Sequence, residues 1–131
     1  MSVVIDSSAV IELLKTAQTS HTWTHPSIDG HDLNAPHLID PEVLNSVRKM
    51  AIRRVATASR LDQMVTDYVG MEIERHRHGP LLDRVWVLRH NITPYDALYV
   101  ALAEELELPL ITADRRLARA AAEFCDVRTI A

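Results

Sequence analysis

The sequence predicts a small α/β protein, a three-layer α/β/α sandwich in which helices cover both faces of a parallel sheet. Three observations predict this fold. Two short apolar runs, Val3–Ile5 and Leu110–Thr112, have the composition of strands that are buried on both faces. Segments with helical spacing of apolar residues separate the predicted strands. The length of 131 residues suits one domain with a single core, which we expect to span residues 1–131.

The first half of the chain is predicted to alternate strands and helices. The expected elements are a central strand at Val3–Ile5, a helix at Ala9–Lys15 capped by Ser7 or Ser8, a polar connection with a short helix at Thr16–Gly30, a strand at Asp32–Ala35, and a helix from Pro41 to about Val55. The last helix is the clearest, because Asp40 suits an N-cap and Pro41 suits the first helical position.

The second half is predicted to be mainly helical. The expected elements are helices at Ser59–His76, Leu81–His90 and Pro94–Glu107, a strand at Leu110–Thr112, a helix from Arg115 to about Glu123, and an edge strand at Asp126–Ile130. Thr93 suits the N-cap of the helix that begins at Pro94. That helix is apolar on most sides, so it is expected to be buried.

Composition excludes several classes of protein. The hydrophobic content of 47% and charged content of 24% are ordinary for a globular protein, and no apolar run approaches the roughly 20 residues of a membrane span. One cysteine, Cys125, excludes an internal disulfide framework. The amino terminus lacks the pattern of a signal peptide, so we expect a cytoplasmic protein. A net charge of −4 does not indicate nucleic-acid binding by itself, and no glycine-rich phosphate loop is present.

Four acidic residues stand where predicted elements meet: Asp6, Glu42, Asp96 and Asp114. Each has an alternative structural role, because Asp114 suits an N-cap, Asp96 suits half of a capping box, and Glu42 complements a helix dipole. Asp6 is harder to explain in this way, because a carboxylate that ends a buried strand is costly unless it has a partner. Ligands bind at the carboxyl ends of parallel strands, so we expect the four acids to converge there.

Converging carboxylates indicate a divalent cation. Mg²⁺ and Mn²⁺ prefer oxygen ligands, so they are the predicted cofactor, with supporting polar groups from Thr112, Ser7 and Asn45. The arginines Arg115, Arg116 and Arg119 follow Asp114 and are predicted to hold a polyanionic backbone beside the acids. The alternative for these arginines is an ordinary solvated helix face.

Four motifs, taken together, resemble a known family. They are VVIDSSAVIELL, PEVLNSVRK, LRHNITPYDALYVALAEEL and LPLITADRRLARAA. In order and spacing they resemble PIN-domain ribonucleases, and within these they are most similar to the VapC-type toxins of bacterial toxin–antitoxin pairs. The resemblance covers nearly the whole chain.

The resemblance implies a metal-dependent endoribonuclease that a cognate antitoxin neutralises. It matches Asp6, Glu42, Asp96 and Asp114 to the acids that surround Mg²⁺ or Mn²⁺ in the family, and Thr112 to the accompanying hydroxyl residue. It also implies an RNA substrate, a homodimer and a toxin–antitoxin hetero-oligomer. Two alternatives are a catalytically silent module that binds antitoxin or RNA, and a metal-dependent phosphatase or phosphoacceptor domain. The Asp-x-Asp motif typical of one such phosphatase group is absent.

Overall fold

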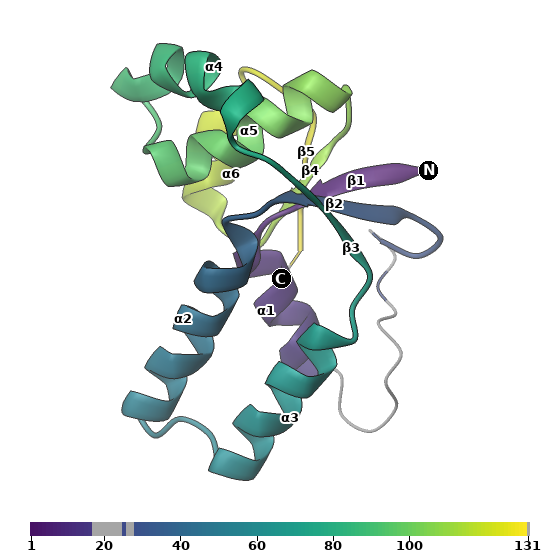
Figure 1. The fold of residues 1–131 in the computed structure, drawn as a ribbon, viewed down its shortest axis with the longest axis vertical. Coiled ribbons are helices and arrows are strands. Elements are labelled where there is room, and N and C mark those ends of the chain that lie inside the picture. Colours follow the sequence, from purple (N-terminus) through teal and green to yellow (C-terminus); the bar gives the residue numbers. More distant parts are fainter. Residues whose placement is uncertain (17–24, 26–27, 131) are drawn as a thin grey trace.

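The protein has the predicted α/β architecture in a computed structural model that describes residues 1–16, 25 and 28–130 (Figure 1). Five strands form one sheet in the order β3-β2-β1-β4-β5, and every neighbouring pair is parallel. The strands are β1 (Ser2–Ile5), β2 (Asp32–Pro36), β3 (Ile73–His76), β4 (Leu110–Thr112) and β5 (Val127–Thr129). Because all five run in the same direction, their carboxyl ends meet at one edge of the sheet.

Helices cover both faces of the sheet. The helices are α1 (Ser7–Thr16), α2 (Ile39–Ile52), α3 (Ala58–Val69), α4 (Leu82–Val87), α5 (Pro94–Leu106) and α6 (Arg115–Ala121). Helices α1, α2 and α3 pack together on one side, α4 and α5 lie on the other, and α6 packs on β4 and β5 (Figure 1). None of the helices within the described ranges is long and apolar enough to cross a membrane.

The core confirms two predictions about burial. Val3, Val4 and Ile5 are fully buried, as expected for the central strand of a covered parallel sheet. Helix α5 packs on β1 and β2, and each of its seven residues from Ala97 to Ala103 is buried. Helix α5 therefore covers one face of the sheet beside the end of β1, and its close packing leaves it little freedom to shift.

The helix predicted over Ser59–His76 is wrong in its second half. Helix α3 ends at Val69, and residues 73–76 form β3, which pairs with β2 at the sheet edge. Only Ile73 of this strand is buried, so no apolar run marks it in the sequence. The helical spacing of the residues before it simply continues onto Ile73, and pairing with β2 overrides that local pattern.

Smaller differences concern helix ends. Helix α2 begins at Ile39, so Asp40 lies inside its first turn and is not its N-cap, and the observed N-cap, Leu38, makes no side-chain capping bond. The predicted helix over 81–90 is divided into α4 and two flanking 3₁₀ turns, Gly79–Leu81 and Leu88–His90. Residues 17–24, 26 and 27 of the predicted polar connection lie outside the described residues. The edge strand near the carboxyl terminus is confirmed as β5.

Candidate active site

Asp6 lies directly after the central strand, at the carboxyl edge of the sheet. One carboxylate oxygen, Oδ1, accepts hydrogen bonds from the Ser8 hydroxyl (2.7 Å) and from the Ala9 amide (2.9 Å). The other, Oδ2, accepts a short hydrogen bond from the Thr112 hydroxyl at the end of β4. Asp6 is only 4% exposed. The hydrogen bond from the Ala9 amide also corrects a prediction, because it makes Asp6 the N-cap of α1. Ser7 and Ser8, which were the predicted caps, are already the first two residues of the helix.

Glu42 approaches the same edge from the first turn of α2. Its carboxylate oxygen Oε1 accepts a hydrogen bond of 2.7 Å from the hydroxyl of Tyr99, a residue of α5 that is 1% exposed. Burial raises the pKa of Glu42, and the hydroxyls of Tyr99 and Ser7 oppose part of this rise. The bond between Tyr99 and Glu42 joins helices from the two layers across the end of the sheet.

Asp96 and Asp114 occupy helix starts, as predicted. The Thr93 hydroxyl accepts a hydrogen bond from the Asp96 amide at the start of α5, which confirms Thr93 as the N-cap. Asp114 caps α6, because its Oδ1 accepts from the amides of Arg116 (2.9 Å) and Leu117 (3.1 Å). The capping role proposed as the alternative for Asp114 is therefore real. It uses a single oxygen of the carboxylate.

The four carboxylates influence one another electrostatically. Burial raises the pKa of Asp6, and the Asp96 charge adds to the rise. Burial likewise raises the pKa of Glu42, with further contributions from Asp96 and Asp6. Burial and then the Asp114 charge raise the pKa of Asp96, while Arg116 opposes the rise. Each acid is thus close enough to at least one other for mutual repulsion.

None of these four acids forms an ion pair within the described part of the chain, where the paired acids are Glu12, Asp40 and Glu104. Among the same residues, no three His, Cys, Asp or Glu side chains are grouped closely enough to form a complete metal site. The arrangement is therefore a set of buried and partly buried carboxylates without ion-pair partners among the described residues, more loosely gathered than a closed metal cage.

The supporting residues divide into two groups. Thr112 donates a hydrogen bond to the Asp6 carboxylate, and Ser7 opposes part of the rise in the pKa of Glu42. Asn45 lies one turn after Glu42 on α2, but its side chain is exposed, and no hydrogen bond links it to the acids in the described structure.

Two functional candidates were missed by the sequence analysis, Ser8 and Tyr99. Ser8 bonds Asp6, lies 3.2 Å from the Thr112 hydroxyl, and accepts from the Ala113 amide (2.9 Å), so it joins the ends of β1 and β4. Tyr99 lies on the helix that the sequence predicts to be apolar on most sides. The available signal was its hydroxyl, because a buried tyrosine hydroxyl needs a polar partner.

The three predicted basic residues differ in position. Arg115, Arg116 and Arg119 are all exposed. Of the three, Arg116 is the one that opposes the rise in the pKa of Asp96, and it lines a cavity of about 350 Å³ together with Asp96 and Thr93. Arg116 therefore lies at the rim of the acidic site.

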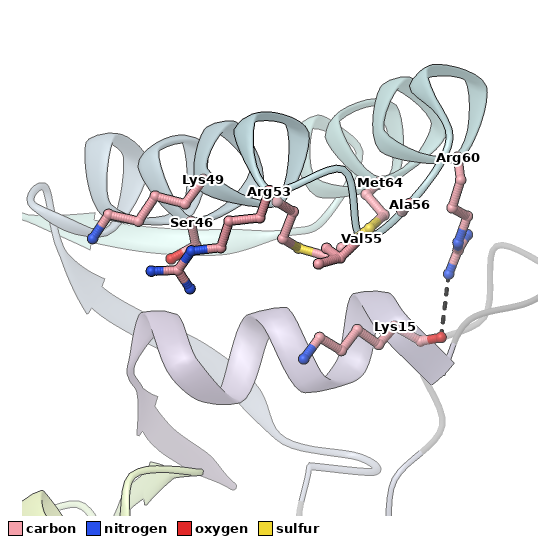
Figure 2. Close-up of a pocket in the computed structure, with 9 residues that line it drawn as sticks. Lys15, Ser46, Lys49, Arg53, Val55, Ala56, Arg60 and Met64 are labelled. Carbon is pink, nitrogen blue, oxygen red and sulfur yellow. Dashed lines mark hydrogen bonds between the residues drawn. The ribbon is translucent and has the colours of Figure 1, made fainter.

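A second cavity, here called the basic groove, lies between α1, α2 and α3 and has a volume of about 610 Å³ (Figure 2). Its cationic lining residues are Lys15, Lys49, Arg53 and Arg60, and its apolar lining residues include Met50, Val55 and Met64. The Arg60 guanidinium donates to the carbonyl oxygens of Leu14 (2.8 Å) and Lys15 (3.2 Å), at the carboxyl end of α1.

Comparison with known proteins identifies the family of this chain. A family model described as "PIN domain" matches residues 3–123. Ribonuclease VapC1 of Mycobacterium tuberculosis is 34% identical over 128 residues, which cover 97% of this chain and 96% of that protein. Ribonuclease VapC9 of the same organism is 32% identical over 129 residues, covering 98% of each chain.

Two solved structures share the fold. PAE2754 from Pyrobaculum aerophilum has a TM-score of 0.63 at 23% identity, covering 97% of this chain and 89% of that one. VapBC2 from Rickettsia felis, bound to a DNA fragment from their promoter, has a TM-score of 0.61 at 11% identity, with 98% of each chain covered. From the family match and the nearly full-length relatives, we conclude that the chain belongs to the PIN-domain family and is a homologue of the VapC ribonucleases.

Proposed function

We propose that the protein is a metal-dependent endoribonuclease toxin that hydrolyses RNA phosphodiester bonds. The observation that supports this most is the group of four carboxylates, Asp6, Glu42, Asp96 and Asp114, none of which forms an ion pair in the described part of the chain. Burial and neighbouring carboxylates of the group raise the pKa values of Asp6, Glu42 and Asp96. Structural acids normally have a cationic partner. The VapC relatives are named ribonucleases, which supports RNA as the substrate.

The donor set suits Mg²⁺ or Mn²⁺. Hard cations take carboxylate oxygens, and Mg²⁺ commonly binds through one or two carboxylates while keeping several waters, so a closed cage of protein ligands is not required. In this proposal Asp6 and Asp96 hold the cation, and Glu42 and Asp114 complete the site directly or through water. The cation, when bound, supplies an activated water and neutralises charge on the scissile phosphate.

The remaining residues of the site position these acids. Thr112 and Ser8 occupy different oxygens of Asp6 and fix the plane of its carboxylate. Tyr99 does the same for Glu42 from the opposite layer. Arg116, at the rim, is placed to contact the RNA backbone beside the scissile bond. Direct attack by water leaves 5′-phosphate and 3′-hydroxyl ends.

Cleavage of RNA by an Asp96→Asn variant tests the proposal. We expect activity with Mg²⁺ or Mn²⁺ to fall roughly 10³-fold, which corresponds to about 4 kcal/mol of lost transition-state stabilisation. The matched control is Glu105→Gln, which neutralises an exposed acid of the same helix and is expected to retain wild-type activity. RNA ends are read by sequencing.

Equal cleavage by the wild type and the Asp96→Asn variant would exclude the assigned site. Partner or RNA binding by the wild type without any metal-dependent cleavage would instead identify a catalytically silent binding module. Release of phosphate from small phosphoesters, without RNA cleavage, would identify a phosphatase.

The proposal includes a protein antitoxin and a homodimer, and the solution mass from light scattering tests both assemblies. The structure of VapBC2 from Rickettsia felis, by its name a VapB–VapC pair, supports an antitoxin partner.

The basic groove is the docking surface that we favour. Lys49 and Arg53, which line it, have no ion-pair partner in the described structure, and apolar residues lie beside them, so an acidic amphipathic segment is complementary to this surface.

Charge reversal in the basic groove tests the docking surface. A Lys49→Glu/Arg53→Glu variant is expected to bind the protein encoded by the neighbouring open reading frame on the order of tenfold more weakly, because like charges then face the acidic segment. Its RNA cleavage should persist. The control is Arg48→Glu, a reversal on the same helix outside the groove. Equal weakening by the control would place the antitoxin elsewhere.

A further inference from the structure

The start of α2, which carries Glu42, is held by an unusual set of contacts. The N-cap residue of this helix, Leu38, makes no side-chain capping bond, although the first amides of a helix need acceptors. The segment before it is instead tied to β3 and the residues that follow β3. The His37 amide donates to the carbonyl oxygen of His76 (3.0 Å), and the Leu38 amide donates to Nε2 of His78 (3.0 Å).

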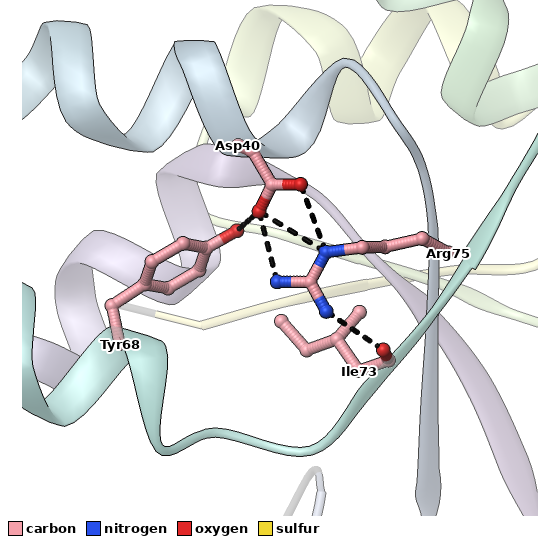
Figure 3. Close-up of polar contacts among 4 residues, drawn as sticks. All are labelled: Asp40, Tyr68, Ile73 and Arg75. Carbon is pink, nitrogen blue, oxygen red and sulfur yellow. Dashed lines mark hydrogen bonds and ion pairs between the residues drawn. The ribbon is translucent and has the colours of Figure 1, made fainter.

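The strongest of these contacts is a side-chain clamp formed by Asp40, Tyr68 and Arg75 (Figure 3). The Arg75 guanidinium donates to both carboxylate oxygens of Asp40, from Nη2 to Oδ1 (2.8 Å) and from Nε to Oδ2 (2.9 Å). The Tyr68 hydroxyl donates to Oδ1 (2.6 Å). Arg75 is itself fixed by a hydrogen bond from Nη1 to the Ile73 carbonyl oxygen (3.0 Å). The clamp thus joins α2, α3 and β3.

The clamp acts on the same helical turn as Glu42. Asp40 and Glu42 are two residues apart, about 200° around the helix axis, so they point to opposite sides of α2. Asp40 is held by Arg75 and Tyr68, whereas Glu42 is held by Tyr99 of α5. The first turn of α2 is therefore held on two opposite sides by side-chain hydrogen bonds.

We propose that Arg75 and Asp40 are positioning residues that hold Glu42 in the acidic site. This inference rests on the proposed nuclease function. In this inference the edge strand β3 has a positioning role, because its residue Arg75 donates hydrogen bonds to Asp40 of α2 (Figure 3). A displacement of about 1 Å in a site residue is enough to lower a reaction rate by about 100-fold, so a distant clamp has a measurable effect.

The test compares Arg75→Gln with Arg84→Gln. Arg84 forms a matched ion pair with Glu104, with bonds of 2.8 and 2.9 Å, between α4 and α5 and outside the acidic site. Three quantities are measured for each protein: thermal stability, Mn²⁺ affinity by calorimetry in the absence of RNA, and amide hydrogen exchange in the first turn of α2. Both substitutions are expected to lower thermal stability to a similar extent.

Only Arg75→Gln should weaken Mn²⁺ binding, by about tenfold or more, and speed exchange of the Glu42 amide. Arg75→Lys keeps the charge but not the two-pronged geometry, and is expected to restore part of the affinity. It also serves as the second variant if Arg75→Gln fails to fold. Asp40→Asn should match Arg75→Gln, and the double variant should add little to either, because the two residues act as one unit.

The outcomes separate this inference from the nuclease proposal. If Arg75→Gln and Arg84→Gln lose the same stability and both keep wild-type Mn²⁺ affinity and exchange, the clamp is only structural and the inference is wrong. If the wild type itself neither binds Mn²⁺ nor cleaves RNA, the nuclease proposal fails. The amide exchange measurement does not depend on metal binding. In that case, unchanged exchange of the Glu42 amide in Arg75→Gln would still show that the clamp does not hold Glu42 in place.

Discussion

An Asp6→Asn variant is expected to lose metal-dependent RNA cleavage while its metal-free fold becomes as stable as the wild type or more so. Cleavage should fall below about a thousandth of the wild-type rate, because the buried carboxylate that we propose as a metal ligand loses its charge. The stability gain, up to about 1 kcal/mol, has a separate cause. Burial and the neighbouring Asp96 charge raise the pKa of Asp6, so the ionised carboxylate is unfavourable until a cation is bound.

Asparagine keeps most of the local structure. Its side-chain oxygen can still accept from the Ala9 amide and the Ser8 hydroxyl, and the Thr112 hydroxyl can turn to accept from the new amide group. Denaturant unfolding in chelator and cleavage with Mg²⁺ measure the two effects. The control is Asp67→Asn, a substitution of another buried aspartate on α3, which should leave cleavage intact. An Asp6→Asn protein that is clearly destabilised but still cleaves RNA would contradict this account.

Removal of divalent metal is expected to abolish cleavage and to make stability depend on pH. A carboxyl group whose pKa is raised by folding stabilises the fold most below its unfolded pKa, and this contribution is lost as pH rises through the folded value. Asp6, Glu42 and Asp96 all have raised pKa values, from ordinary values of 3.8 for aspartate and 4.5 for glutamate. The metal-free protein should therefore lose stability as pH rises above this range.

Added Mg²⁺ should reverse the trend, because it binds the ionised carboxylates of the folded protein. Its stabilising effect, about 2.7 kcal/mol at a concentration 100 times its dissociation constant, should be larger at about pH 8 than at about pH 5. Asp40 titrates in a different window. Hydrogen bonds from Arg75 lower its pKa, so its contribution is lost only as pH falls below 3.8. Melting curves with Mg²⁺ and with chelator, recorded across this range, measure the effect. Equal stabilisation at both pH values would show that the cation does not bind these acids.

The residues that the sequence revealed are those with a strong local signal. Asp6 directly follows an apolar strand. Asp96 lies three residues after the N-cap Thr93, and Asp114 caps the helix that follows strand β4, so a few neighbouring residues define each position. Parallel strands carry the ends of β1 and β4 to one edge, so the contact between Asp6 and Thr112 follows from the predicted fold. These features are local or are imposed by the architecture.

The features that escaped prediction depend on long-range pairing. The edge strand β3 has only one buried residue, and it becomes a strand by pairing with β2. Asp40 follows the pattern of an N-cap, but the helix starts at Ile39, two residues earlier than predicted. The Asp40 carboxylate instead bonds Arg75, which is 35 positions away in the sequence. The contact of Tyr99 with Glu42 spans two helices in different layers. The periodicity of apolar residues predicts where helices form, but it does not predict which side chains of different elements meet.

A crystal structure of the protein with Mn²⁺, analysed by anomalous scattering, tests the central claim most directly. We expect a manganese peak at the carboxyl edge of the sheet, with carboxylate oxygens of Asp6 and Asp96 about 2 Å from the ion and Glu42 and Asp114 next to it or joined to it by water. No peak at this edge under saturating Mn²⁺, or a peak bound only by side chains elsewhere in the chain, would contradict it.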